Sequence, residues 1–132
     1  MADPEAKLES IVPIFQVADL RRAIAHYRDC LDFELAWSWS DPPLAAVCRD
    51  RVQITLAESA EVPPRRSHVY LELCGVEAYH RRIAAAGAEI TVSLTDRPYG
   101  MRDFRIRDPD GNEISIGEPI ATAGTGAARG AS

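Results

Sequence analysis

The sequence predicts an α+β fold made of two βαβββ modules. The chain has 132 residues, which is the length of one ordinary domain. The spacing of its hydrophobic residues is typical of a strand, then a helix, then three strands, and this order occurs a second time. The alternation of residues 50–56 also matches that of residues 110–116. A period of about 60 residues suits a duplicated supersecondary module better than a solenoid repeat.

The first module begins with an apolar, β-branched segment, residues 11–17, which predicts a strand. Asp19 then supplies a side-chain oxygen that suits a helix N-cap. Apolar residues follow at helical spacing from Leu20 to Leu31 and predict an amphipathic helix of roughly three turns. Turn-forming residues divide the next part into three strands, over residues 33–39, 44–48 and 52–57.

The second module repeats this order after a proline-containing linker, residues 61–66. A strand over residues 68–73 precedes a helix over residues 76–86, which Gly87 ends. Three more strands are predicted over residues 90–94, 102–107 and 113–117, with a loop at 96–100 and a turn at 108–111. The predicted organisation is a flexible N-terminus (1–9), one domain (10–118, with modules at about 10–60 and 66–118) and a flexible tail (119–132).

Composition excludes several classes of function. The net charge of −5 argues against non-specific nucleic-acid binding, which depends on clustered Lys and Arg. No apolar run approaches the roughly 18–20 residues of a membrane-spanning helix and no secretory signal is visible, so we expect a cytoplasmic protein without a membrane partner. The three cysteines lack a C-x-x-C spacing, so we expect neither a disulfide framework nor a zinc site. No nucleophile elbow, P-loop or dinucleotide-binding glycine pattern is present.

Three stretches of sequence carry a resemblance to a known family. They are residues 15–20 with 25–33, residues 68–73 with the helix ending at Ala86-Gly87, and residues 100–112, which are the most specific. In these stretches the chain resembles the vicinal oxygen chelate superfamily, which groups glyoxalases, extradiol dioxygenases, fosfomycin resistance enzymes and bleomycin resistance proteins. It is closest in pattern to the bleomycin resistance proteins. The resemblance covers residues 11–118 and implies a mixed sheet that curls into a cleft, commonly completed across a homodimer.

The resemblance also implies where a divalent metal ion would be held. Its ligand positions fall on Val12, His68 and Ser115, with a fourth near Thr55. Valine has no donor atom, and serine or threonine hydroxyls are poor ligands compared with imidazole or carboxylate. We therefore expect no bound metal and no cofactor. If the alignment is displaced by two residues, period-2 alternation offers a different set of metal ligands, namely Gln16, His68 and Glu113.

Strand alternation predicts which side chains line the cleft. The polar side chains on that side are Gln53, Thr55, His68, Tyr70, Glu72, Glu113 and Ser115, with Asp103 and Arg105 as additions. An unpaired buried polar group costs about 1–3 kcal/mol, so this set suits a water-filled, ligand-accepting concavity better than a dry core. The alternative is an ordinary solvated sheet face. His26 and His80 lie on the predicted helices, where we expect solvated or rim positions without a role.

Aromatic residues form a second candidate feature. Trp37 and Trp39 lie on one side of a single strand, where they either pack in the core or stack on a flat aromatic or cationic guest. Tyr99 and Met101 flank Gly100 in a loop that we expect to cover the cleft.

Together these features predict a metal-free small-molecule binding protein, a homodimer that sequesters a bulky aromatic or cationic compound in its clefts. The candidate ligand-binding residues, none of them catalytic, are Trp37, Trp39, Gln53, His68, Tyr70, Glu72, Tyr99, Arg105, Glu113 and Ser115. One alternative is a divalent-metal-dependent lyase, isomerase or dioxygenase that uses the displaced ligand set. The other is a structural or regulatory protein whose aromatic residues pack against another chain.

Overall fold

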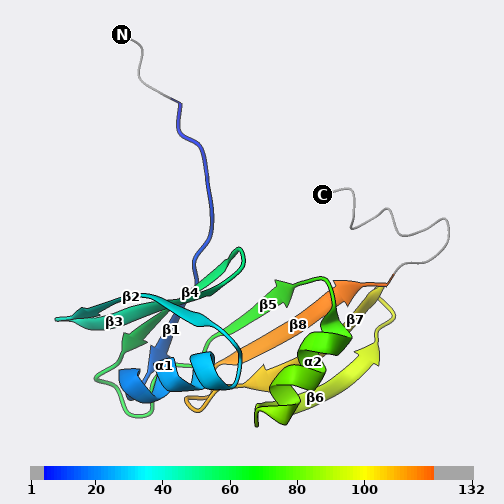
Figure 1. Cartoon of the computed structure of the whole chain (residues 1–132). Coiled ribbons are helices and arrows are strands. Elements are labelled where there is room, and N and C mark those ends of the chain that lie inside the picture. The colour runs from blue at the N-terminus through cyan, green and yellow to red at the C-terminus, as the bar shows by residue number, and fades with distance from the viewer. Residues whose placement is uncertain (1–4, 121–132) are drawn as a thin grey trace.

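The computed structural model describes residues 5–120 and confirms the two-module α+β fold (Figure 1). The first module consists of β1 (Ile14–Val17), α1 (Leu20–Asp29), β2 (Glu34–Ser40), β3 (Pro43–Arg49) and β4 (Val52–Glu58). The second consists of β5 (His68–Glu72), α2 (Val76–Ala85), β6 (Glu89–Asp96), β7 (Met101–Arg107) and β8 (Glu113–Pro119). Of the ends expected to be flexible, residues 1–4 and 121–132 lie outside the described part of the chain.

Both modules use the same strand arrangement. The strand order is β1-β4-β3-β2 in the first sheet (sheet A) and β5-β8-β7-β6 in the second (sheet B). In each sheet the first strand of the module pairs in parallel with the last strand, and the other neighbours are antiparallel. The duplication in the sequence therefore corresponds to two separate four-stranded sheets.

Several boundaries differ from the predicted ones by one to three residues, and the differences at the two ends of the domain have a structural reason. The first strand begins at Ile14 and not at residue 11, because Pro13 has no N–H to donate and pairing with β4 covers only the four residues of β1. At the other end, β8 runs to Pro119, and Ile120 donates its N–H to a carbonyl oxygen of the β6–β7 loop at 2.9 Å. The ordered fold thus includes two residues of the expected tail.

The two helices are capped in different ways. Asp19 caps α1 as predicted, because its Oδ1 accepts the N–H of Arg22 at 3.0 Å. At α2 the carboxylate of Glu118, from β8, accepts the N–H groups of Gly75 and Val76 instead. Within the described residues, neither helix is long and apolar enough to cross a membrane.

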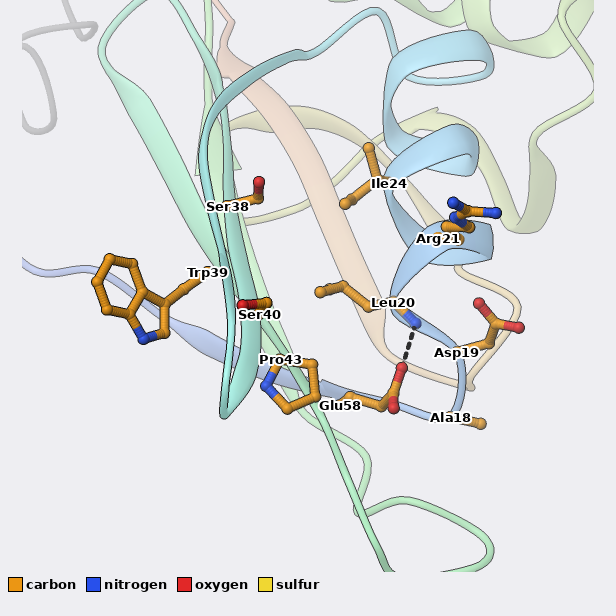
Figure 2. Close-up of a pocket in the computed structure, with 10 residues that line it drawn as sticks. All are labelled: Ala18, Asp19, Leu20, Arg21, Ile24, Ser38, Trp39, Ser40, Pro43 and Glu58. Atoms are coloured by element: carbon orange, nitrogen blue, oxygen red, sulfur yellow. Dashed lines mark hydrogen bonds between the residues drawn. The ribbon is translucent and has the colours of Figure 1, made fainter.

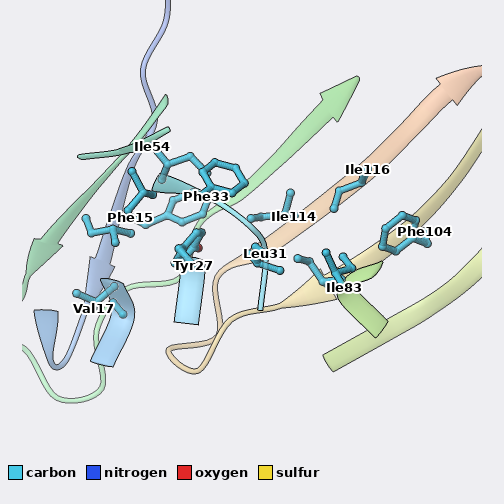
Figure 3. Close-up of a cluster of buried hydrophobic side chains, with 14 of the residues drawn as sticks. Phe15, Val17, Tyr27, Leu31, Phe33, Ile54, Ile83, Phe104, Ile114 and Ile116 are labelled. Atoms are coloured by element: carbon cyan, nitrogen blue, oxygen red, sulfur yellow. The ribbon is translucent and has the colours of Figure 1, made fainter. Parts of the chain in front are cut away.

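One hydrophobic core joins the two modules (Figure 3). It contains buried side chains from both helices and both sheets, including Phe15, Val17, Tyr27, Leu31, Phe33, Ile54, Ile83, Phe104, Ile114 and Ile116. Along each strand these apolar residues alternate with residues that point to the opposite side of the sheet. Each sheet therefore has a second face, here called its helix-free face, that does not pack on the core.

The turn after β7 fastens the second module to the first. Asp108 is buried, and its carboxylate accepts hydrogen bonds from the hydroxyl of Tyr27 in α1 (2.8 Å) and from the side chain of Asn112 (3.1 Å). Asn112 also donates to the backbone carbonyl of Gln16 in β1 at 3.0 Å. The segment that carries the most specific part of the family resemblance is thus a connection between modules.

Candidate ligand-binding site

The helix-free face of sheet B holds six of the predicted ligand-binding residues. They are His68, Tyr70 and Glu72 on β5, Arg105 on β7, and Glu113 and Ser115 on β8. The strand register places His68 opposite Glu113, and it places Ser115 between Tyr70 and Arg105. Because β8 lies between β5 and β7, these side chains share one face of three adjacent strands.

A line of polar contacts crosses this face. His68 Nε2 lies 2.8 Å from Oγ of Ser115, and Nε of Arg105 donates to the same Oγ at 3.2 Å. Nη1 of Arg105 lies 3.7 Å from the carboxylate of Glu113. Since the Ser115 hydroxyl accepts a hydrogen bond from a guanidinium, its own proton can be donated to Nε2 of a neutral imidazole.

A second polar cluster surrounds Asp103 of β7, which is only 5% exposed. The hydroxyls of Tyr70 (2.9 Å) and Tyr99 (2.7 Å) both donate to its Oδ2, and Nε of Arg97 donates to its Oδ1 at 2.6 Å. Burial opposes ionisation of Asp103, but these three hydrogen bonds outweigh it and hold the pKa of Asp103 below its usual value. The hydrogen bond to Asp103 also raises the pKa of Tyr99.

Arg97 is a member of this polar cluster that the sequence does not predict. It belongs to the β6–β7 loop, where neither strand alternation nor helical spacing gives a side chain a direction. Its Nη2 also donates to the backbone carbonyls of Ser93 and Asp103, so it ties the loop that carries Tyr99 to two strands. Met101 was expected in this loop, but it begins β7 and is buried.

The tryptophans and Gln53 lie on sheet A. Trp37 is 43% exposed and Trp39 is 63% exposed, so neither is a core residue. Figure 2 shows the ring of Trp39 projecting from β2 away from Leu20 and Ile24 of α1. Trp37 lies two residues earlier in the strand, on the same helix-free face. One chain therefore carries two aromatic or polar surfaces, one on each sheet.

Two pockets of the single chain lie near these surfaces. One, of about 850 Å³, lies between the start of α1 and β2, and Trp39 is the one predicted site residue among those that line it (Figure 2). The other, of about 950 Å³, lies between the β3–β4 hairpin and the start of α2, and Glu72 lines it. The remaining predicted residues line neither of these two pockets.

The residues at the implied metal positions do not fit a divalent ion. Val12 offers no donor atom, and Ser115 already accepts from the guanidinium of Arg105, whose charge repels a cation. In the displaced set, the amide oxygen of Gln16 accepts a backbone N–H at 3.1 Å, and Glu113 faces Arg105. Across residues 5–120, no three His, Cys, Asp or Glu side chains are grouped as metal ligands would be.

The two helix histidines are half-buried, which fits the rim position and not the fully solvated one. Nε2 of His26 is buried and has no hydrogen-bond partner among the described residues, and the same is true of Oδ2 of Asp110. Burial lowers the pKa of His26, although the charges of Asp108 and Asp110 oppose this shift. His80 contacts the core edge-on at Phe104, with 4.8 Å between ring centroids.

The duplicated βαβββ architecture, with polar side chains on the helix-free face of sheet B and exposed indoles on sheet A, places the chain in the class of two-module α+β folds. A sequence profile of the Glyoxalase/Bleomycin resistance protein/Dioxygenase superfamily matches residues 7–116. The chain belongs to this superfamily. A search of curated protein sequences finds no match.

Solved structures with the same fold include proteins of different function. TioX from Micromonospora sp. ML1 aligns with a TM-score of 0.74 at 20% identity, covering 85% of this chain and 99% of TioX. The bleomycin-binding protein from bleomycin-producing Streptomyces verticillus, complexed with copper(II)-bleomycin, aligns with a TM-score of 0.70 at 21% identity, covering 89% and 100%. Lactoylglutathione lyase from Agrobacterium tumefaciens aligns with a TM-score of 0.68 at 21% identity, covering 86% and 96%. At these identities the likeness extends to the fold alone.

Proposed function

We propose that this protein is a metal-free small-molecule binding protein that sequesters a bulky aromatic or cationic compound. Capture takes place in clefts between two copies of the chain, where the helix-free face of sheet A in one copy meets that of sheet B in the other. The bound compound is held and then released unchanged.

The observation that carries the proposal is the position of Arg105 on the helix-free face of sheet B. Its guanidinium donates to Ser115, at one of the implied metal positions, and pairs with Glu113. A cationic side chain there fills the space that a metal ion needs, and its N–H groups bind the oxygen lone pairs that would otherwise coordinate the ion. The same contacts fix polar groups that suit the orientation of a bound molecule.

The charges of this face support an aromatic or cationic ligand. The carboxylates of Glu72, Asp103 and Glu113 lie on it, where Asp103 pairs with Arg97 and Glu113 pairs with Arg105. Carboxylates fixed in this way suit a positively charged group of a ligand. The exposed indoles on sheet A offer π faces to flat or positively charged groups, with about 0.5–1.5 kcal/mol for each stacked pair.

Titration with copper(II)-bleomycin and with metal-free bleomycin, followed by tryptophan fluorescence, tests the proposal. We expect quenching that saturates, and we expect Trp39→Ala to weaken binding about 3- to 10-fold, as the loss of one stacked ring implies. Leu35→Ala is the matched control, because Leu35 is also exposed on β2 but pairs with Val47, which faces the core. Absence of quenching by either compound would remove bleomycin-like molecules from the ligand class.

A divalent-metal-dependent lyase, isomerase or dioxygenase is the second candidate. The register favours it at one point, since His68 and Glu113 lie directly opposite each other on β5 and β8. Elemental analysis after dialysis against a weak chelator distinguishes the two candidates. We expect far less than one metal ion per chain, and stoichiometric nickel, zinc, manganese or iron would favour the enzyme.

A further inference from the structure

We infer that Asp103 determines the specificity of this site. Its carboxylate accepts the hydrogen bonds that the hydroxyls of Tyr70 and Tyr99 donate. The site therefore prefers flat aromatic guests that carry N–H donors over flat aromatic guests that carry acceptor groups. The inference rests on the proposed function and names the chemistry of its ligand. It concerns a residue that is buried beneath the surface on which the guest lies.

The geometry around Asp103 fixes both tyrosines. Tyr70 comes from β5 and Tyr99 from the β6–β7 loop, yet their hydroxyls converge on one carboxylate oxygen, at 2.9 and 2.7 Å. Arg97 occupies the other carboxylate oxygen and balances the buried charge. The rings themselves remain on the surface, with Tyr70 43% exposed and Tyr99 61% exposed.

The donor and acceptor capacity of a phenol gives the specificity. Each tyrosine hydroxyl has one proton, and in both residues that proton is directed at Asp103. Neither hydroxyl can therefore donate a hydrogen bond to a guest. An amino or amidinium group attached to an aromatic ring can donate to the oxygen of the exposed Tyr99, whereas a carboxylate finds no donor in either hydroxyl and meets the charge of Asp103 behind them.

Gly117 of β8 makes this arrangement possible. It lies opposite Asp103 in the sheet, and a methyl group at this position would overlap the Tyr70 hydroxyl and lie 2.7 Å from Cβ of Asp103. Only glycine therefore leaves room for the Tyr70 hydroxyl to reach the carboxylate. The close approach indicates that Asp103 does more than fill the sheet face.

Two planar three-ring probes test the inference. Proflavine is a cation with two ring-bound amino groups, and anthracene-9-carboxylate is an anion with acceptor oxygens. In fluorescence titrations we expect proflavine to bind the native protein at least 10-fold more tightly. Asp103→Asn should reduce this ratio at least 5-fold. Asp96→Asn, which removes the same charge from an exposed residue paired with Arg102, should leave it unchanged.

A second measurement needs no ligand. Alkaline titration of tyrosine absorbance should show Tyr99, assigned by comparison with Tyr99→Phe, ionising at lower pH in Asp103→Asn than in the native protein. If Asp103→Asn does not fold, Tyr99→Phe alone should reduce the probe ratio about 3-fold.

Equal binding of both probes, or tighter binding of the carboxylate, would overturn the inference while bleomycin binding still supported the proposed function. Failure of both probes and of bleomycin to bind would overturn the proposed function and the inference together.

Discussion

At the scale of one residue, His26 has a buried ring nitrogen without a hydrogen-bond partner among the described residues. Burial favours the neutral imidazole and lowers its pKa in the folded protein. The unfolded chain takes up a proton near the ordinary value of about 6.5. A histidine whose pKa is lower in the folded protein than in the unfolded chain makes folding less favourable as the pH falls below the unfolded pKa of about 6.5.

We therefore predict that His26→Gln flattens the pH dependence of stability. Between pH 7 and pH 5, the free energy of unfolding of the unsubstituted protein should fall more steeply than that of the variant. The reason is that His26 takes up a proton when the unsubstituted chain unfolds, whereas glutamine takes up none. Urea denaturation at half-unit pH intervals measures both curves. Parallel curves for the two proteins would show that His26 is solvated and titrates normally.

At the scale of elements, the connection between α1 and the turn after β7 depends on a few buried hydrogen bonds. The hydroxyl of Tyr27 donates to Asp108 at 2.8 Å, and burial together with that carboxylate raises the pKa of Tyr27 well above its usual value. The hydroxyl therefore stays protonated as a donor over the whole physiological range. The two partners are 81 residues apart in the sequence and belong to different modules.

Tyr27→Phe should consequently destabilise the protein by about 1–2 kcal/mol, because it removes one buried hydrogen bond to a charged group and leaves the ring packing intact. Arg28→Ala is the neighbouring control. Within residues 5–120, the one ion pair of Arg28 is an exposed one with Asp29, so we expect a change within about 0.5 kcal/mol. Equal destabilisation in the two variants, measured by chemical denaturation, would argue against a connection through Asp108.

The same contacts explain how far the sequence could predict the structure. The order of strands and helices, the Asp19 cap and the polar face of sheet B depend on local periodicity, which is visible in the sequence. The bonds from Arg97 to Asp103 and from Tyr27 to Asp108 depend on how distant segments meet, and no local pattern contains that information. For the same reason the sequence does not show that Nε2 of His26 is buried, since the acidic residues beside it come from the other module.

At the scale of the whole molecule, one chain leaves aromatic side chains exposed on both sheets. Trp37 and Trp39 lie on sheet A, while Tyr70 and Tyr99 lie on or beside sheet B. Exposed apolar surface of this kind is typical of interaction sites. The proposed homodimer would cover part of it and would combine the two kinds of face into closed clefts.

We predict that sedimentation velocity gives twice the mass of the chain at micromolar concentration. Dimer formation should also bring the indoles of one copy near the tyrosines of the other, and so Trp37→Ser together with Trp39→Ser should weaken association. A chain that stays monomeric at about 100 µM would contradict the intersubunit cleft, because the interface of a stable dimer normally forms well below that concentration.

Calorimetric titration with metal-free bleomycin, in the presence of excess EDTA, is the most direct test of capture without a metal ion. We expect one binding event per chain, with an affinity that EDTA does not change. Binding that appears only after one equivalent of a divalent ion has been restored would contradict a site in which Arg105 takes the place of the metal.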